Sequence, residues 1–183
     1  MGMKTLKLLT TTIIVAGVAL AGHAAENKLD RKKLQADVDA AIKAFKAADT
    51  GLADTFKKAT GYAVFPNVGK GGFILGGAHG NGLVYEKGKV IGYTSLTQVT
   101  VGAQVGGQEL SEVIFFETPA ALAKFKEAEY TMSAQVSAVA AAEGASQNAK
   151  YVDGVMVFTK AKSGLMAEAS VGGQKFKFEP VGK

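Results

Sequence analysis

The chain of 183 residues has no cysteine, 48% hydrophobic residues and a formal net charge of +5, with an isoelectric point near 9.3. The missing cysteine excludes disulfides, thiolate metal sites and a lipid-modified amino-terminal cysteine. The basic balance favours attraction to anionic surfaces, but a single arginine and the lack of aromatic residues interleaved with basic ones argue against a nucleic-acid partner.

The first 24 residues have the pattern of a secretory signal peptide. Lys4 and Lys7 precede an uncharged run over residues 8–21, and small residues follow before charge begins. We predict cleavage after Ala24, with Ala21 as the second choice. The alternative is a transmembrane anchor, but a span needs about 20 apolar residues, and this run is shorter and contains three threonines.

The predicted mature chain, residues 25–183, has the length of one domain with its own hydrophobic core. Export through a signal peptide predicts a periplasmic or secreted protein. Because no cysteine is present to carry a lipid, the protein is not expected to be a lipoprotein.

Residues 29–59 predict a pair of helices. Asp30 is the expected N-cap of the first, Thr50 and Gly51 are expected to separate the two, and Gly61 is expected to follow the second. Apolar residues recur at steps of three and four, which places on one helical face Leu34, Val38, Ala41, Ile42 and Phe45.

The opposite face of the first helix, over residues 30–48, carries charged side chains, namely Lys32, Lys33, Lys43 and Lys46 together with Asp37 and Asp39. The simpler interpretation is a helix docked on its own domain with a solvated outer face. The other interpretation is a helix that also lies on a membrane.

From Tyr62 the hydrophobic period drops toward two and glycine becomes frequent, which predicts strands. Pro66 is expected to end the first strand. Short turns are expected at Gly80–Gly82, Lys87–Gly88 and Gly106–Gly107, and such connections join antiparallel neighbours. The predicted strands are 62–65, 73–78, 83–86, 90–96, 99–105 and 110–116.

Thr118 and Pro119 are expected to begin a third helix that fades near Tyr130. Residues 132–144 fit either a helix or a strand, with strand favoured. Final strands are predicted at 151–161, 165–171 and 174–179, with Gly172–Gly173 as a hairpin turn. The predicted fold class is α+β: a curved, mostly antiparallel or barrel-like sheet, with an N-terminal helical pair and one further helix packed on it.

The residues offer little catalytic chemistry. In the glycine-rich segment 69–82, Lys70 is followed by glycine where a phosphate loop needs serine or threonine. His79 lacks an orienting aspartate and is expected to be an exposed residue of a glycine turn. Glu109 and Glu112 are expected on opposite faces of a strand. We therefore expect no catalytic residues, no metal site and no cofactor.

Lysines near the predicted turns are candidates for binding a phospholipid headgroup, namely Lys57, Lys58, Lys70, Lys87 and Lys89. If they gather at one end of the sheet, they form a cationic rim, and each lysine near an anionic membrane contributes about 1 kcal/mol. The alternative is that these lysines only keep the hairpin ends soluble.

A series of short motifs runs through the strand region. It comprises Ala63–Phe65, Lys70–Phe73, Gly76–Gly77, Gly80–Gly82, Gln104–Gly107, Val113–Phe116, Gly164–Leu165 and Ala169–Gly172. In order and spacing this series resembles the SYLF domain, also called the Ysc84-type actin-binding or lipid-binding domain, over about residues 34–179.

The resemblance implies a module that binds phospholipid membranes through an amphipathic helix and basic residues. It makes Lys70 a candidate headgroup contact and helix 30–48 the counterpart of the amphipathic element. The chain departs from the family at Tyr93–Leu96, in place of a Trp-Ser-x-Pro motif, and at 142–146, in place of a Gly-Pro-x-Gly-Arg turn. The missing arginine argues against specific recognition of polyphosphoinositides.

The sequence thus predicts a non-enzymatic module of the bacterial cell envelope that binds an anionic phospholipid or membrane surface. Relatives also bind actin, but actin is not expected as a partner of an exported bacterial protein. The alternative is a structural or protein-interaction protein of the envelope with no lipid role and an unknown protein partner. A hydrolase built on His79 is a third and weaker interpretation.

Overall fold

The computed structural model describes residues 11–72, 75–101, 108–163 and 171–182, and within them the side chains of 30–69, 77–99, 109–162 and 171–182. The helices are α1 (Thr11–Ala48), α2 (Leu52–Lys58), α3 (Pro119–Phe125) and α4 (Ala145–Asn148). The strands are β1 (Gly61–Gly72), β2 (Leu75–Glu86), β3 (Lys89–Val101), β4 (Gln108–Phe116), β5 (Tyr130–Thr131), β6 (Ala138–Ala140), β7 (Val155–Ser163) and β8 (Lys175–Pro180).

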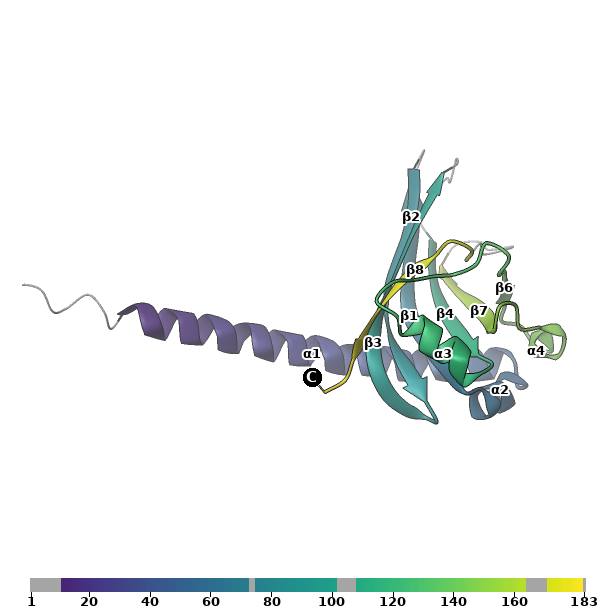
Figure 1. Cartoon of the computed structure of the whole chain (residues 1–183), viewed down its shortest axis with the longest axis horizontal. Helices are drawn as coiled ribbons and strands as arrows, with labels where there is room; N and C mark the ends of the chain where they lie inside the picture. Colours follow the sequence, from purple (N-terminus) through teal and green to yellow (C-terminus); the bar gives the residue numbers. More distant parts are fainter. Residues whose placement is uncertain (1–10, 73–74, 102–107, 164–170, 183) are drawn as a thin grey trace, which may run out of the picture.

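These strands form one curved sheet in the order β5-β8-β3-β2-β1-β4-β7-β6 (Figure 1). Every neighbouring pair is antiparallel except β6 with β7, which is parallel. The predicted α+β class, with a curved and mostly antiparallel sheet, is confirmed.

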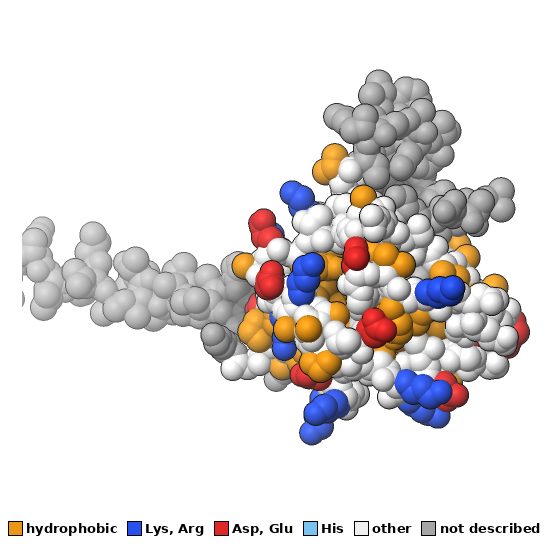
Figure 2. All heavy atoms as spheres, turned by 45° about the vertical axis from the view of Figure 1, so that its right-hand side comes forward, with side chains coloured by type: hydrophobic (Ala, Val, Ile, Leu, Met, Phe, Trp, Pro, Cys, Tyr) orange, Lys and Arg blue, Asp and Glu red, His pale blue; other side chains and the backbone are white. Residues whose placement is uncertain are grey.

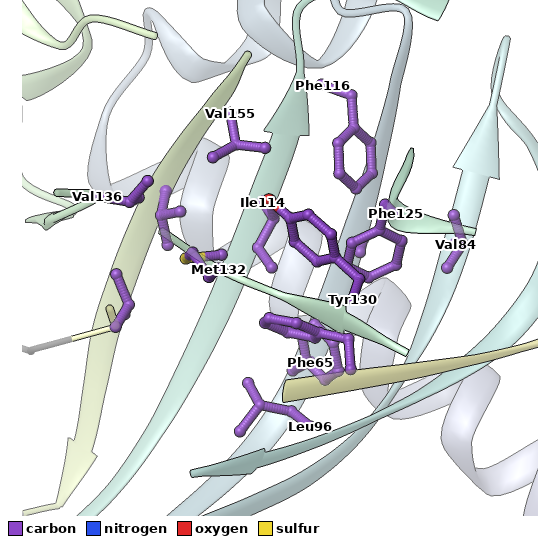
Figure 3. Packing of buried hydrophobic residues seen from close by; sticks show 14 of the residues in the cluster. Phe65, Val84, Leu96, Ile114, Phe116, Phe125, Tyr130, Met132, Val136 and Val155 are labelled. Atoms are coloured by element: carbon purple, nitrogen blue, oxygen red, sulfur yellow. The ribbon is translucent and has the colours of Figure 1, made fainter. Parts of the chain in front are cut away.

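The inner face of the sheet is filled by aromatic and aliphatic side chains (Figure 3). Phe176 is central to this cluster, since its ring lies 5.7 Å from Phe65 and 5.2 Å from Phe125 between centroids. Phe125 comes from α3, so that helix covers part of the inner face. Tilted rings at these separations add to the stabilisation from area burial alone.

One segment, residues 130–141, covers both edges of the sheet. It contributes β5 to one edge and β6 to the other. Beside β5, the Met132 N–H donates to the Gln174 carbonyl at 2.9 Å, and beyond β6 the Ala141 N–H donates to the Thr159 carbonyl at 2.8 Å. The segment therefore pairs edges that would otherwise offer unpaired backbone groups. It is neither the continuous strand favoured for 132–144 nor a helix.

The outer face of the sheet is covered by α1 and α2. Val38, Ala41 and Phe45 of α1 are buried there, as the helical spacing predicted. From α2, Phe56 packs edge-on against Phe115 of β4 with ring centroids 4.8 Å apart. Both faces of one sheet are thus buried, which explains why its strands are apolar over long runs.

Two tyrosines lie under the helices on neighbouring strands. The rings of Tyr62 and Tyr85 stack with centroids 4.8 Å apart, and the Gln35 amide of α1 donates to the Tyr85 hydroxyl at 2.9 Å. Burial, with smaller contributions from Tyr85 and Asp39, raises the pKa of Tyr62 to about 12. Its packing beneath the helices thus disfavours the charged phenolate form of Tyr62.

The helix boundaries differ in part from the predictions. α1 begins at Thr11, so Asp30 lies inside the helix and is not its cap. Ala59 ends α2 in an extended conformation, so Gly61 opens β1 and is not a helix terminator. The third helix is confirmed at its start, where the Thr118 hydroxyl accepts from the Ala121 N–H at 3.1 Å. It ends at Phe125, before Tyr130.

Several predicted strands are halves of longer ones. β1 continues past Pro66 through a register shift between Val64 and Asn67. β2 runs straight through Gly80–Gly82, which is therefore not a turn, and β3 joins 90–96 to 99–101. The Lys87–Gly88 turn is confirmed, with φ of 51° and 75° at its two residues.

The C-terminal strands match in part. β7 and β8 correspond to the predicted strands at 151–161 and 174–179. A turn at Gly172–Gly173 is confirmed, because Gly173 has φ of 78° and the Gln174 N–H donates to the Val171 carbonyl at 3.2 Å. The Gly106–Gly107 turn and nearly all of strand 165–171 lie outside the described residues.

The glycines of β2 meet the irregular part of β1. A Cβ on Gly82 would lie 2.4 Å from the Val64 carbonyl oxygen and 2.8 Å from the Phe65 ring, and one on Gly80 would lie 2.8 Å from the Asn67 carbonyl oxygen. Close approach of β1 therefore requires glycine in this strand.

We predict that Gly82→Ala lowers the free energy of unfolding by about 1–3 kcal/mol, because the methyl group displaces the Phe65 ring or the β1 backbone. Chemical denaturation measures the loss. Gly69→Ala is the matched control, since a Cβ on that β1 glycine meets nothing within 4 Å. Equal stability of the two variants would contradict this explanation.

Asp49, at the end of α1, joins the helical pair to the loop that leads into α4. Its buried carboxylate accepts from the Gly51 N–H at 3.0 Å and from the Ser146 N–H at 2.6 Å. Next to it, the Thr50 hydroxyl donates to Glu143 Oε1 at 2.8 Å. Burial alone would raise the pKa of Asp49, but hydrogen bonds from Ser146, Gly51 and Gly144 outweigh burial and lower it.

Because this pKa is lowered on folding, the stability that Asp49 contributes is present above its ordinary value of 3.8 and is lost as the pH falls through the lower folded value. We predict that Asp49→Asn costs about 2 kcal/mol at pH 7, as expected for hydrogen bonds to a charged group, and flattens the loss of stability in acid. Denaturation midpoints from pH 7 to 2 test this. Asp37→Asn, on the same helix, is the matched control, because Asp37 makes no hydrogen bond or ion pair with the described residues, and it should cost less stability at pH 7 than Asp49→Asn.

Candidate functional site

Four of the five candidate headgroup lysines lie at one end of the sheet. Lys57 and Lys58 end α2 immediately before β1, whose first residue, Gly61, pairs with Glu86 of β2. Glu86 in turn pairs with Lys89, and Lys87 lies in the turn between them. All four lysine side chains are exposed. The structure thus places these four lysines around the same strand ends.

Lys70 lies at the other end. It is nine residues along β1 from Gly61 and pairs with Ala78 and Gln108. At the usual rise of a strand this separation is roughly 30 Å. The side chain of Lys70 is outside the described residues. The rim expected from the sequence is therefore not formed by all five lysines.

The lysines of α1 lie opposite its buried face. Lys32, Lys33, Lys43 and Lys46 are all exposed. Lys46 also covers the α2–sheet contact, with its Nζ atom 5.0 Å from the centre of the Phe56 ring. The apolar face of this part of α1 is packed on the sheet and is not free to enter a membrane. Any contact of this part of α1 with a membrane would therefore be made by its lysines.

Acidic side chains are mixed with these basic ones. Asp54 lies 3.7 Å from Lys57, and Figure 2 shows acidic and basic side chains interspersed over one face rather than a single continuous basic patch. Attraction to an anionic surface would therefore depend on local groups of lysines and would weaken with salt.

His79 does not lie in a turn, because Gly80–Gly82 continues β2. It is an exposed residue within that strand, where it pairs with Gly69 and Thr97. Among the described residues no group of three or more histidine or acidic side chains is placed to hold a metal ion. In the same part of the chain no helix has the combined length and apolarity that crossing a membrane requires.

The inner face of the sheet contains buried polar side chains whose burial we did not predict from the sequence. Glu109 and Glu112 lie on opposite faces of β4, as predicted, but Glu112 is fully buried. The buried Gln174 amide donates to Glu112 Oε2 at 3.0 Å, and the Gln98 amide donates to the Gly172 carbonyl at 3.1 Å. The burial of Glu112 could have been predicted from the alternation of residues in β4, because this alternation places Glu112 on the same face as the apolar Leu110 and Ile114.

A groove of about 530 Å³ lies between α1 and the outer face of β2, β3 and β8. Its residues are Asp30, Arg31, Leu34, Asn81, Gly82, Tyr93, Thr94, Ser95, Lys177, Phe178 and Glu179. At one side of the groove, Arg31 lies over the Tyr93 ring, 4.4 Å from its centre, with Nη2 3.4 Å from Glu179 Oε1. None of the nine lysines predicted from the sequence lines it.

Comparison with known proteins finds a family similarity in the second half of the chain. Residues 97–180, from β3 to β8, match the family model Ysc84, described as "Las17-binding protein actin regulator". The second half of the chain is thus similar to the Ysc84 family. This confirms the resemblance to the SYLF, or Ysc84-type, domain that the motif series predicted.

A curated relative of the chain is "Beta cell expansion factor A" of Aeromonas veronii. It is 31% identical over 123 residues, which are 66% of this chain and 46% of the relative. The chain thus spans about half the length of this relative. The aligned length exceeds the 84 residues (97 through 180) of the Ysc84 match, so the similarity extends beyond that match.

Proposed function

We propose that this protein is exported and binds anionic phospholipid at the surface of a bacterial envelope membrane, without catalysing a reaction. The observation that carries the proposal is the convergence of Lys57, Lys58, Lys87 and Lys89 on one end of the sheet, on an exposed surface. The basic net charge and the similarity to the Ysc84 family support it.

The burial of the apolar face of α1 indicates the mode of binding. With Val38 and Phe45 fully buried against the sheet, this part of the helix cannot insert without leaving its own core. Contact through lysines at the membrane surface leaves the fold intact. Each lysine near an anionic surface contributes about 1 kcal/mol, so several must act together.

A second candidate function is protein binding, which is favoured by the similarity to a family described as a Las17-binding protein. This function needs no lipid. Protein binding would be supported if the purified protein did not bind vesicles but formed a defined complex with an envelope protein.

We predict that the purified protein sediments with phosphatidylglycerol vesicles at low salt and is released as salt rises. The double variant Lys87→Ala, Lys89→Ala should weaken binding roughly 30-fold, which is the effect of two lysines at about 1 kcal/mol each. Co-sedimentation over a range of vesicle concentrations measures the change.

The matched control is Lys162→Ala, Lys175→Ala, which removes the same charge from two exposed lysines toward the other end of the sheet. This control should retain at least half of the parental affinity. Equal loss in both variants would mean that only net charge matters, and no retention of the parent protein would contradict membrane binding.

A further inference from the structure

The groove between α1 and the sheet has a charge pattern that the proposed function does not use. Arg31 is engaged by Glu179 and by the Tyr93 ring. Asp30 and Lys177 also line the groove, and neither makes an ion pair or hydrogen bond with any residue in the described part of the chain. Asp30 of α1 and Lys177 of β8 thus line the same groove with opposite charges and do not form an ion pair with each other.

The floor of the groove offers hydrogen-bonding groups next to the positive charge. Asn81 of β2, Ser95 of β3 and Lys177 of β8 are direct register partners across three adjacent strands, so their side chains lie side by side on the outer face. An amide, a hydroxyl and an ammonium group in one row are donors for phosphate oxygens.

The groove also has apolar surface and suitable size. Leu34 and Tyr93 are half-buried residues beside the charged groups. The volume of about 530 Å³ lies within the range typical of small-molecule sites. A ligand that satisfies every feature carries a phosphate, a positive charge a few bonds away and an apolar portion.

We propose that this groove binds the headgroup of a zwitterionic phospholipid that carries a phosphodiester and a primary ammonium, as in phosphatidylethanolamine. The phosphodiester lies against Lys177, Ser95 and Asn81, and the ammonium group lies against Asp30. A zwitterion contacts both of these exposed charges, whereas a simple anion contacts only Lys177 and a simple cation only Asp30. The inference rests on the proposed membrane function and adds a specific lipid class to it.

The test is a titration followed through the backbone amide resonances of Ser95 and Lys177. The probe is glycerophosphoethanolamine, compared with glycerol 3-phosphate and ethanolamine. We expect the zwitterion to bind at least tenfold more tightly than either half. A site that binds glycerol 3-phosphate or ethanolamine equally well, or no shift with any probe, overturns the proposal.

Variants test the two charges separately. Lys177→Ala and Asp30→Asn should each weaken binding of glycerophosphoethanolamine at least fivefold. Lys175→Ala is the matched control, since Lys175 is an exposed lysine two residues away on β8 that does not line the groove, and it should bind like the parent protein. Equal affinity of Lys177→Ala and Lys175→Ala contradicts the assignment.

A vesicle experiment distinguishes the lipid from the free headgroup. Phosphatidylcholine vesicles containing phosphatidylethanolamine should retain more protein than vesicles without it, with no anionic lipid present. Binding of the soluble headgroup without this increase would contradict a lipid ligand. If the protein does not bind phosphatidylglycerol vesicles, by contrast, the proposed function is contradicted. The headgroup titration still tests the groove independently of that result.

Discussion

The packing of α1 and α2 on the outer face of the sheet is the contact on which the rest of the structure depends. Val38, Phe45 and Phe56 cover one face of strands whose other face is already filled by an aromatic cluster. A sheet buried on both sides has its surfaces for binding only at strand ends, edges and uncovered parts of its outer face. The lysines at the strand ends and the groove beside α1 are such surfaces.

The same packing decides how the domain can meet a membrane. An amphipathic helix that binds a bilayer normally buries its apolar face among the lipids. Here the apolar face of α1 from Leu34 onward is used by the protein itself, and its lysines point to solvent. Residues 130–141 also pair with part of β8 at one edge of the sheet and with part of β7 at the other. Contact through surface charges and a headgroup groove is consistent with both constraints.

Local patterns predicted those elements that local chemistry determines. The spacing of Val38, Ala41 and Phe45 predicted the buried face of α1, and Thr118 with Pro119 predicted the start of α3. The predicted turn at Gly80–Gly82 was wrong, because glycine is required there by the close approach of β1 and does not form a turn. That approach depends on the irregularity near Pro66, which cannot be read from either strand alone.

For the candidate lysines, too, local patterns predicted some features and the pairing of strands determined the others. Lys57–Lys58 and Lys87–Lys89 were found as pairs near turns, but their shared end of the sheet, and the distance of Lys70 from it, follow from strand register. Asp30 and Lys177 line the same groove although they lie far apart in the sequence, and no local pattern indicates that they do.

The most direct test of this account is amide hydrogen exchange of residues 38–45 in α1, measured with and without phosphatidylglycerol vesicles that retain the protein. If the helix remains docked while the lysines contact the membrane, the protection of these amides stays the same on binding. A marked loss of protection in the vesicle-bound state would show that α1 leaves the sheet, and it would contradict membrane contact through surface lysines with the helix docked.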